Sequence, residues 1–364
     1  MLQKFPVNRD NSFYQAWPDL ALTRSGRLVC VFSECTHHGD RTHSRIMGVT
    51  SDDRGRTWTA KRPVTPALLK KKPGDPHWNC ARVTTLRDGR LVVIVDRVAG
   101  AHEGAENGGE QSNWLWFSGD EGETWQGPVA TPVTGIVPDQ IVELAHGPHA
   151  GRWTTAAHSF QGPDRRLWSQ RLWYSDDAGK SWQGPSIIAG EPGLKLCEGS
   201  VLELPGEGGL VCFLRENSAL GLDAFRAFSR DGGVTWSTLS KFPLPGCHRP
   251  VAGMLQSGRV LITHRFLPGS AGGWGWMTQN VFVALTDTAS CANPERNAAK
   301  LRIMPLDYDR SPVADTGYTG WVQFPDGEIY IVNYIVDDAD PLAQIRGYSL
   351  REEDFYLPTQ GITD

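Results

Sequence analysis

One pattern, S-x-D-x-G-x-[ST]-W, occurs four times in the chain: SDDRGRTW at residues 51–58, SGDEGETW at 118–125, SDDAGKSW at 175–182 and SRDGGVTW at 229–236. The four copies start 67, 57 and 54 residues apart, which indicates one supersecondary unit per copy. At this spacing a fifth copy is expected near Thr286-Asp287-Thr288, a degenerate remnant of the pattern. A sixth unit then reaches the end of the chain.

Each copy of the pattern is expected to form a turn. Its Asp can accept hydrogen bonds from nearby backbone N–H groups, its Gly can adopt a positive φ, and its Trp can pack beneath the turn. Because the same chemistry recurs at four places, these boxes are expected to be scaffold and not an active site.

A second repeated feature is a short polar turn with Gly between two apolar runs, which is typical of a β-hairpin. Six units of about four short strands predict an all-β fold, a six-bladed β-propeller of four-stranded antiparallel blades with the boxes as turns. We expect a single domain over residues 1–364, with the blades covering roughly 5–358. The hairpin turns are residues 24–27, 87–90, 146–152, 205–209, 256–259 and 325–328.

Composition excludes several classes of protein. Hydrophobic residues make up 40% and charged residues 21% of the 364, so the chain is neither disordered nor a coiled coil. The net charge of -5 argues against nucleic acid as a partner. The sequence contains no run of about 18 apolar residues and no secretory signal, so we expect no membrane association and a cytoplasmic location. Seven cysteines without a CxxC pair are expected to be reduced thiols.

The hairpins also predict which residues surround the central axis. The first strand of each blade runs from one face, here called the top, to the hairpin turn, and the second strand returns. Charged residues at a concave mouth favour a binding or catalytic site, although an Arg–Glu network between blades is the alternative. Counting from the turns places the first strands' top residues at Trp17, Cys80, Pro138, Glu198, Arg249 and Tyr318. The second strands return to the top at Ser33, Asp96, His158, Arg215, Arg265 and Tyr334.

The repeated box resembles the Asp-box of the sialidase (neuraminidase) superfamily, and the blades are similar to its exo-sialidase branch over most of the chain. The more specific likeness lies in Glu198 of CEGSV, Arg215 of FLR, Tyr318 of GYTG and Asp40 of HHGD. The resemblance implies that Tyr318 is a nucleophile and Glu198 its base. It also implies that Asp40 protonates the leaving oxygen and later activates water.

The chemistry agrees with these roles. A carboxylate on the anomeric carbon repels an anionic nucleophile, and a neutral tyrosine avoids that repulsion. Sialidases, unlike most glycosidases, use such a tyrosine nucleophile. A phenol with a pKa of about 10 needs a base at neutral pH, which Glu198 can supply. The prediction is a retaining hydrolase that acts on a non-reducing terminal acidic sugar, sialic acid or a relative.

Two positions depart from the family. Sialidases open blade one with Arg-Ile-Pro, the first Arg of a triad that binds the substrate carboxylate, but residues 16–18 here are Ala-Trp-Pro. The stretch that should carry the third Arg, residues 276–280, reads WMTQN. Arg82, Arg249 and Arg265 lie at rim positions instead. Either they rebuild a carboxylate clamp with Arg215, or the substrate is not an ordinary sialic acid.

Other rim residues could assist. His38 and His158 are expected to hydrogen-bond sugar hydroxyls or to move protons, and Trp17 could stack on a sugar ring or simply pack. His37-His38 followed by Asp40 resembles half of a metal site, but no Cys or His follows at a zinc-like spacing. We therefore expect no metal and no other cofactor.

Two other functions stay open. A polysaccharide lyase on uronic-acid glycans would use Tyr318 or a histidine to abstract the C5 proton while an Arg neutralises the carboxylate. A non-catalytic propeller would bind glycans without turnover. The expected partner in every case is a carbohydrate, anionic for either enzyme, and the sequence does not determine the oligomeric state.

Overall fold

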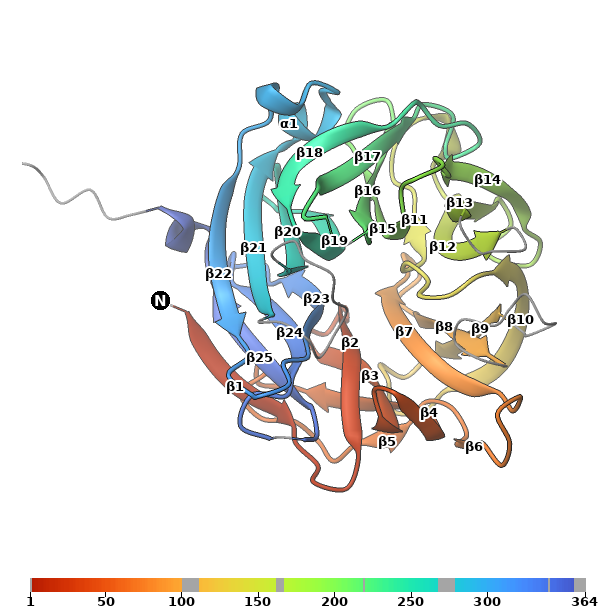
Figure 1. Ribbon diagram of the computed structural model, residues 1–364, viewed down its shortest axis with the longest axis vertical. Coiled ribbons are helices and arrows are strands. Elements are labelled where there is room, and N and C mark those ends of the chain that lie inside the picture. The colour runs from red at the N-terminus through yellow and green to blue at the C-terminus, as the bar shows by residue number, and fades with distance from the viewer. Residues whose placement is uncertain are drawn as a thin grey trace, which may run out of the picture.

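The computed structural model describes residues 2–99, 111–161, 167–218, 220–267, 279–339 and 341–356. Its strands form six antiparallel sheets arranged around a central axis (Figure 1). Helix is almost absent: the described residues contain one short α-helix, α1 (Thr288–Ala292), and 3₁₀ turns at Gly147–His149, Arg296–Ala298 and Glu352–Phe355. The predicted all-β six-bladed propeller is confirmed.

The blades follow the chain in order. Blade one contains β2 (Tyr14–Leu22), β3 (Leu28–His37), β4 (Asp40–Ser51) and β5 (Arg62–Pro63), and β6 (Leu68–Leu69) also pairs with β4. Blade two contains β7 (His77–Thr85), β8 (Leu91–Val98), β9 (Gln111–Ser118) and β10 (Gln126–Thr134). Blade three contains β11 (Val142–Glu143), β12 (Trp153–Gln161), β13 (Leu167–Ser175) and β14 (Gln183–Ala189).

The second half continues the same arrangement. Blade four contains β15 (Leu196–Glu203), β16 (Leu210–Glu216), β17 (Asp223–Ser229) and β18 (Ser240–Pro245). Blade five contains β19 (Cys247–Met254), β20 (Arg259–Phe266), β21 (Asn280–Asp287) and β22 (Arg302–Tyr308). Blade six contains β23 (Thr316–Gln323), β24 (Ile329–Ile335), β25 (Gln344–Leu350) and, from the other end of the chain, β1 (Gln3–Asn8).

The ring is closed by β1. This strand pairs antiparallel with β25, with Phe5 opposite Gly347 (Figure 1). Phe5 also stacks on Tyr330 of β24, with ring centroids 6.1 Å apart. Box spacing carries no information about this pairing, because β1 precedes the first box. The pairing covers the outer edge of β25, which would otherwise offer unpaired backbone groups to another strand.

All six predicted hairpin turns are present. Each is closed by a backbone hydrogen bond across the turn, for example from Leu86 N–H to Arg90 O (2.8 Å) and from Phe324 N–H to Glu328 O (2.8 Å). Each of these turns contains a glycine of positive φ, such as 94° at Gly89 and 88° at Gly327, which explains why glycine occurs there. The positions of these turns fix which residue of each inner strand reaches the top of the ring.

The four boxes share one set of contacts. In the first, Gly55 N–H donates to Ser51 Oγ (2.8 Å), Thr57 N–H donates to Asp53 Oδ1 (2.8 Å) and Trp58 Nε1 donates to Gly55 O (3.1 Å). The corresponding Ser–Gly and Asp–Thr or Asp–Ser bonds recur in the other three copies. At the degenerate fifth position, Asp287 instead caps α1 by accepting from Ser290 N–H (2.6 Å).

Apolar residues fill the spaces between neighbouring blades. Val29 and Val31 of blade one pack in one cluster with Val83, Leu91 and Val93 of blade two. All seven cysteines are free and buried, as expected for reduced thiols. Across the described ranges, no helix is long and apolar enough to span a bilayer.

Candidate active site

Irregular backbone at the top of the inner strands directs side chains toward the axis. The inner strands of five blades change register there, at residues 17–18, 79–80, 198–199, 249–250 and 317–318. A β-bulge of this kind bends the strand and re-aims a side chain. Glu198 and Arg249 have φ of 48° and 50°. This left-handed conformation costs a non-glycine residue about 1 kcal/mol or more, and such strain is concentrated at functional sites.

Three predicted residues meet at the axis. The Tyr318 hydroxyl of β23 donates to Glu198 Oε1 of β15. Arg215 of β16 donates through Nη1 to Glu198 Oε2 (2.7 Å) and to the Tyr318 oxygen (3.4 Å), and through Nη2 to Asn217 Oδ1 (2.6 Å). The three residues are nearly buried, with exposed fractions over the whole residue of 8% for Tyr318 and 6% for Glu198 and Arg215. We call them the axial triad.

Charge determines where the proton of the triad lies. Burial would raise the pKa of Glu198, but the charges of Arg215, His158 and Arg265 outweigh it and lower that pKa to about 2. Burial and the Glu198 carboxylate raise the pKa of Tyr318 well above its ordinary value. At neutral pH the pair is therefore a carboxylate that accepts a hydrogen bond from a neutral phenol.

Two further predicted arginines face the Tyr318 ring. The guanidinium carbon of Arg265 lies 5.3 Å from the ring centroid and that of Arg249 lies 5.9 Å from it. Arg249 Nη2 donates to Pro138 O (3.0 Å). Among the described residues, Nε of Arg215, Nε of Arg265 and Nη1 of Arg249 are buried without a hydrogen-bond partner. Buried donors without partners indicate a place for a ligand rich in acceptors.

Arg82 lies in a layer of paired charges further along the inner strands. Its Nε is 3.3 Å from Asp19 Oδ2, and its Nη1 donates to Thr319 O (2.9 Å). Asp19 in turn accepts from Val83 N–H of the next blade (2.8 Å). These contacts join blades one, two and six, so Arg82 has structural partners in addition to its predicted role in binding substrate.

His158 supports the triad from blade three. Its Nδ1 accepts from the backbone N–H of Glu198 (3.4 Å). Its ring lies parallel to that of Trp168, with centroids 6.0 Å apart. The histidine is 2% exposed, and its contacts therefore orient the strained residue that carries the carboxylate.

Trp17 occupies the position where sialidases open blade one with arginine. A guanidinium nevertheless reaches this position, from the β3–β4 hairpin of the same blade. The guanidinium carbon of Arg41, on β4, lies 4.0 Å over the Trp17 ring. Sequence reasoning missed Arg41. The alternation of side chains along a strand could have indicated it, because polar Asp40 and Thr42 on either side are expected to face solvent, which directs Arg41 inward. In the structure Asp40 and Thr42 are exposed and Arg41 is buried.

Asp40 and His38 flank the same turn but differ in placement. The Asp40 carboxylate is exposed and accepts from Thr42 N–H (2.8 Å) and Thr42 Oγ1 (2.7 Å), and these bonds lower its pKa. His38 Nδ1 instead contacts Asp315 Oδ2. Among the described residues, no contact joins Asp40 to the axial triad.

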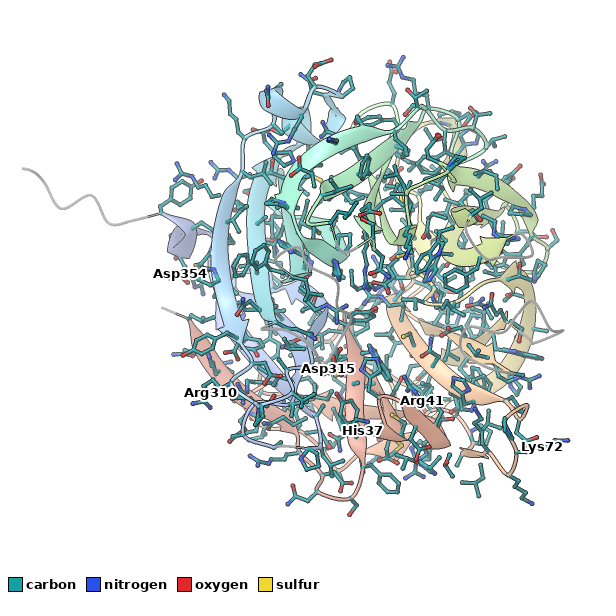
Figure 2. All side chains as sticks on the ribbon, in the orientation of Figure 1. His37, Arg41, Lys72, Arg310, Asp315 and Asp354 are labelled. Atoms are coloured by element: carbon teal, nitrogen blue, oxygen red, sulfur yellow. The ribbon has the colours of Figure 1, made fainter. Side chains whose placement is uncertain are left out.

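Asp315 is a second residue that sequence reasoning missed. Its carboxylate accepts from the hydroxyls of Tyr14 and Tyr334, the latter at 2.7 Å, as well as contacting His38. Figure 2 shows Asp315, His37 and Arg41 on the side of the ring next to β2 and the β3–β4 hairpin. The available signal was its place in the sequence, three residues before Tyr318.

The stretch where sialidases carry the third arginine of the triad, residues 276–280, lies partly outside the described residues, at 276–278. Its Gln279 is buried and donates to Ala314 O (2.9 Å). Within the described ranges, no group of three His, Cys, Asp or Glu side chains is arranged to hold a metal ion. The histidine and aspartate of the HHGD turn point to different partners, Asp315 and Thr42.

Comparison with known families agrees with the repeat pattern. A family model described as a BNR repeat-like domain matches residues 26–273, about two thirds of the chain. The chain belongs to this family. Because the model spans the four boxes, the match covers the repeats from which the propeller was predicted.

Solved structures resemble this BNR propeller in fold. A protein of unknown function from Dyadobacter fermentans matches with a TM-score of 0.75 and 22% identity, over 96% of this chain and 99% of that one. An intramolecular trans-sialidase from Ruminococcus gnavus, solved with oseltamivir carboxylate, matches with a TM-score of 0.68 and 14% identity, over 94% and 96%. The NanB sialidase of Streptococcus pneumoniae matches with a TM-score of 0.68 and 14% identity, over 96% and 70%. The fold is a sialidase-like BNR propeller.

Proposed function

We propose that this BNR propeller is a retaining glycoside hydrolase that removes a non-reducing terminal acidic sugar, sialic acid or a close relative. The observation that carries the proposal is the axial triad: a neutral phenol hydrogen-bonded to an ionised carboxylate beside a guanidinium. These groups come from three strands and meet at the axis of the ring. A purely structural ion pair does not require the tyrosine hydroxyl on the same carboxylate.

The triad can perform nucleophilic substitution. As Tyr318 attacks the anomeric carbon, its proton passes to Glu198, so no anionic nucleophile approaches the substrate carboxylate beforehand. Arg215 keeps Glu198 ionised before the attack and stabilises charge on the phenol oxygen during it, since Nη1 lies 3.4 Å from that oxygen.

Arginines around Tyr318 would bind the substrate carboxylate. Arg215, Arg265 and Arg249 bring three positive charges to the ring, against the single negative charge of Glu198 within the triad. Their buried unpartnered N–H groups would become paired in the complex. Arg41 over Trp17 adds a cation from blade one. Arg82, which is held by Asp19, is proposed to contribute less.

A proton must also reach the leaving oxygen. Two side chains on the turn between β3 and β4 are candidates for this transfer. Asp40 follows from the resemblance to sialidases, and His38 follows from its contact with Asp315. The rest of the proposed mechanism is the same for either group.

The test is turnover of a panel of aryl glycosides of sialic, ketodeoxy and uronic acids. Release of the phenol, with NMR detection of the first-formed anomer having the configuration of the substrate, is expected. A fluorinated sugar of the same series should label Tyr318, which peptide mass spectrometry would identify. Ultraviolet absorbance of an unsaturated product would instead indicate a uronate lyase, and binding without turnover would indicate a glycan-binding propeller.

A further inference from the structure

We propose that His38, oriented by Asp315, is the residue that exchanges the proton with the leaving oxygen and then with water. This inference rests on the proposed glycosidase function and assigns one residue within that site. It replaces a carboxylic acid with a histidine–aspartate pair at the step of proton transfer.

The contact with Asp315 defines the tautomer of His38. Asp315 also accepts from the hydroxyls of Tyr14 and Tyr334, so three donors converge on one carboxylate. Burial alone would raise the pKa of Asp315, but His38 and Tyr14 outweigh it and lower that pKa. An ionised Asp315 holds the proton of His38 on Nδ1, and the ring then gains and loses its other proton at Nε2.

The pair adjoins the axial triad. Tyr334 donates to Asp315 (2.7 Å), and its ring centroid lies 6.1 Å from that of Tyr318. The His38 ring meets Trp17 edge-on at 5.0 Å. Its side chain is 13% exposed, more than Glu198 at 8%. His38 is therefore linked to the nucleophile through Asp315 and Tyr334, and its greater exposure suits a group that meets the leaving part of a substrate.

Asp40 lacks the corresponding support. Its carboxylate is exposed, and its hydrogen bonds within the described residues are to Thr42 of its own turn, so no buried residue among them holds it toward the axis. His38 instead has a buried partner that fixes its ring. Proton transfer requires such a positioned group.

The proposed steps balance. In the first, Tyr318 oxygen bonds to the anomeric carbon and passes its proton to Glu198, while the glycosidic C–O bond breaks and the leaving oxygen takes the proton from His38 Nε2. In the second, His38 Nε2 takes a proton from water, the water oxygen bonds to the anomeric carbon, and the C–O bond to Tyr318 breaks. Glu198 returns its proton to Tyr318, so every residue is restored.

This cycle starts from protonated His38, which predicts a pH dependence. Burial lowers the pKa of His38 below its usual 6.5, Asp315 raises it, and Arg41 and Arg265 lower it further. The value of kcat/KM for the free enzyme should therefore fall as pH rises through a pKa below 6.5. Within the described part of the chain, the titratable or charged groups that contact His38 or act on its pKa include Asp315, Tyr14, Arg41 and Arg265.

Leaving-group dependence is the decisive measurement. Hydrolysis of the 4-nitrophenyl glycoside of the sugar found by the panel needs little proton donation, whereas hydrolysis of the methyl glycoside needs it fully. His38→Gln should lower kcat/KM by about 10²–10⁴-fold for the methyl glycoside but less than about 10-fold for the 4-nitrophenyl glycoside. Asp40→Asn is the matched control from the same turn and should change both rates by one common factor.

Two variants test whether Asp315 sets the pKa of His38, because they should shift the pH profile in opposite directions. Asp315→Asn should move the falling limb of the pH profile to lower pH, because the charge that raises the pKa of His38 is gone. Tyr14→Phe should move it to higher pH, because Asp315 loses one donor and interacts more strongly with His38. A merely structural role would leave the limb in place, and Tyr14→Phe keeps the test open if Asp315→Asn fails to fold.

The outcomes separate the two proposals. Equal losses for both glycosides in His38→Gln, or a selective loss in Asp40→Asn, would overturn the assignment of His38 while the hydrolase stands. Cleavage that survives in Tyr318→Phe, or no turnover by the unaltered protein, would overturn the proposed function and this assignment with it.

Discussion

Tyr318 and Glu198 are 120 residues apart in the chain, yet one hydroxyl and one carboxylate form the centre of the site. Arg215 contacts both, so the acceptor, the donor and the compensating charge are held as a unit. This arrangement leaves the phenol neutral and the carboxylate ionised. At the residue scale, the proposed nucleophile would therefore become anionic only as it reacts.

Tyr318→Phe should abolish turnover with little change in stability, because it removes the nucleophilic oxygen and almost no volume. We expect a loss in kcat of at least about 1,000-fold, as for other activated nucleophiles. Glu198→Gln should lose as much activity, since an amide cannot take the proton. Turnover of the aryl glycoside and Tm measure the two effects. Tyr308→Phe, at a side chain that is 57% exposed, is the control; near-normal rates in Tyr318→Phe would count against the nucleophile.

Arg249 is proposed to serve both stability and binding, and two substitutions separate these roles. Burial raises the pKa of Asp139 and of Asp19, and the charge of Arg249 offsets part of each rise. Arg249→Met should therefore lower the free energy of unfolding by about 3 kcal/mol, since Asp139 loses the larger of the two arginine charges that offset its burial. Arg249→Lys should recover most of that stability but not kcat/KM, because lysine lacks the guanidinium fork. Urea unfolding measures the stability of each variant and steady-state kinetics measures kcat/KM. An Arg249→Met variant of unchanged stability would refute the electrostatic pairing of Arg249 with the buried carboxylates.

At the element scale, the boxes and the bulges use the same unusual backbone. The residue before the box glycine is left-handed in every copy, with φ of 63° at Arg54, 55° at Glu121, 57° at Ala178 and 66° at Gly232. Only the last of these residues is a glycine. The bulges show the same conformation at Trp17, Glu198 and Arg249, where glycine would remove a side chain of the candidate site. Scaffold positions can be relieved of this strain, whereas site positions cannot.

Ala178→Gly should stabilise the protein. The alanine is exposed, and a left-handed φ costs it about 1–2 kcal/mol, more than glycine loses in chain entropy. We expect a gain of about 0.5–1 kcal/mol in the free energy of unfolding, measured as a higher urea midpoint at constant slope. Ala178→Val, which worsens the crowding, should shift the midpoint the other way. A destabilised Ala178→Gly would show that the turn is not strained.

At the scale of the whole molecule, closure of the ring depends on the first residues of the chain. Without β1, the outer edge of β25 would be unpaired and Tyr330 would lose its stacked Phe5. Val7 of the same strand is 5% exposed and packs in the cluster that contains Tyr14, Trp17 and Tyr318. The strand that closes the ring thus contacts the apolar support of the site.

Deletion of residues 2–9 should lower the free energy of unfolding by about 3 kcal/mol, from the lost burial of Val7 and Phe5. The exposed edge should also promote self-association. Calorimetry and light scattering measure the two effects. The exposed Gln3→Ala is the control, and a monomeric deletion variant with unchanged Tm would contradict closure by β1.

Local chemistry is what the sequence determined by itself. Turn residues, box residues and their spacing act within about ten neighbours, so six hairpins, four boxes and the number of blades were predictable. Counting from the turns then placed Glu198, Arg215 and Tyr318 at one end of the inner strands, and the family resemblance suggested their roles. Their contact in the structure agrees with this placement, and their roles stay predictions.

Only the tertiary structure decided which distant groups touch. The partner of β25 and the contact between His38 and Asp315, 277 residues apart, have no local signature. Each depends on how the ring closes and how neighbouring blades pack, because closure brings the last blade beside the first. Asp40 shows the same limit: its place in the sequence suits an acid, but local hydrogen bonds to Thr42 direct its carboxylate to solvent.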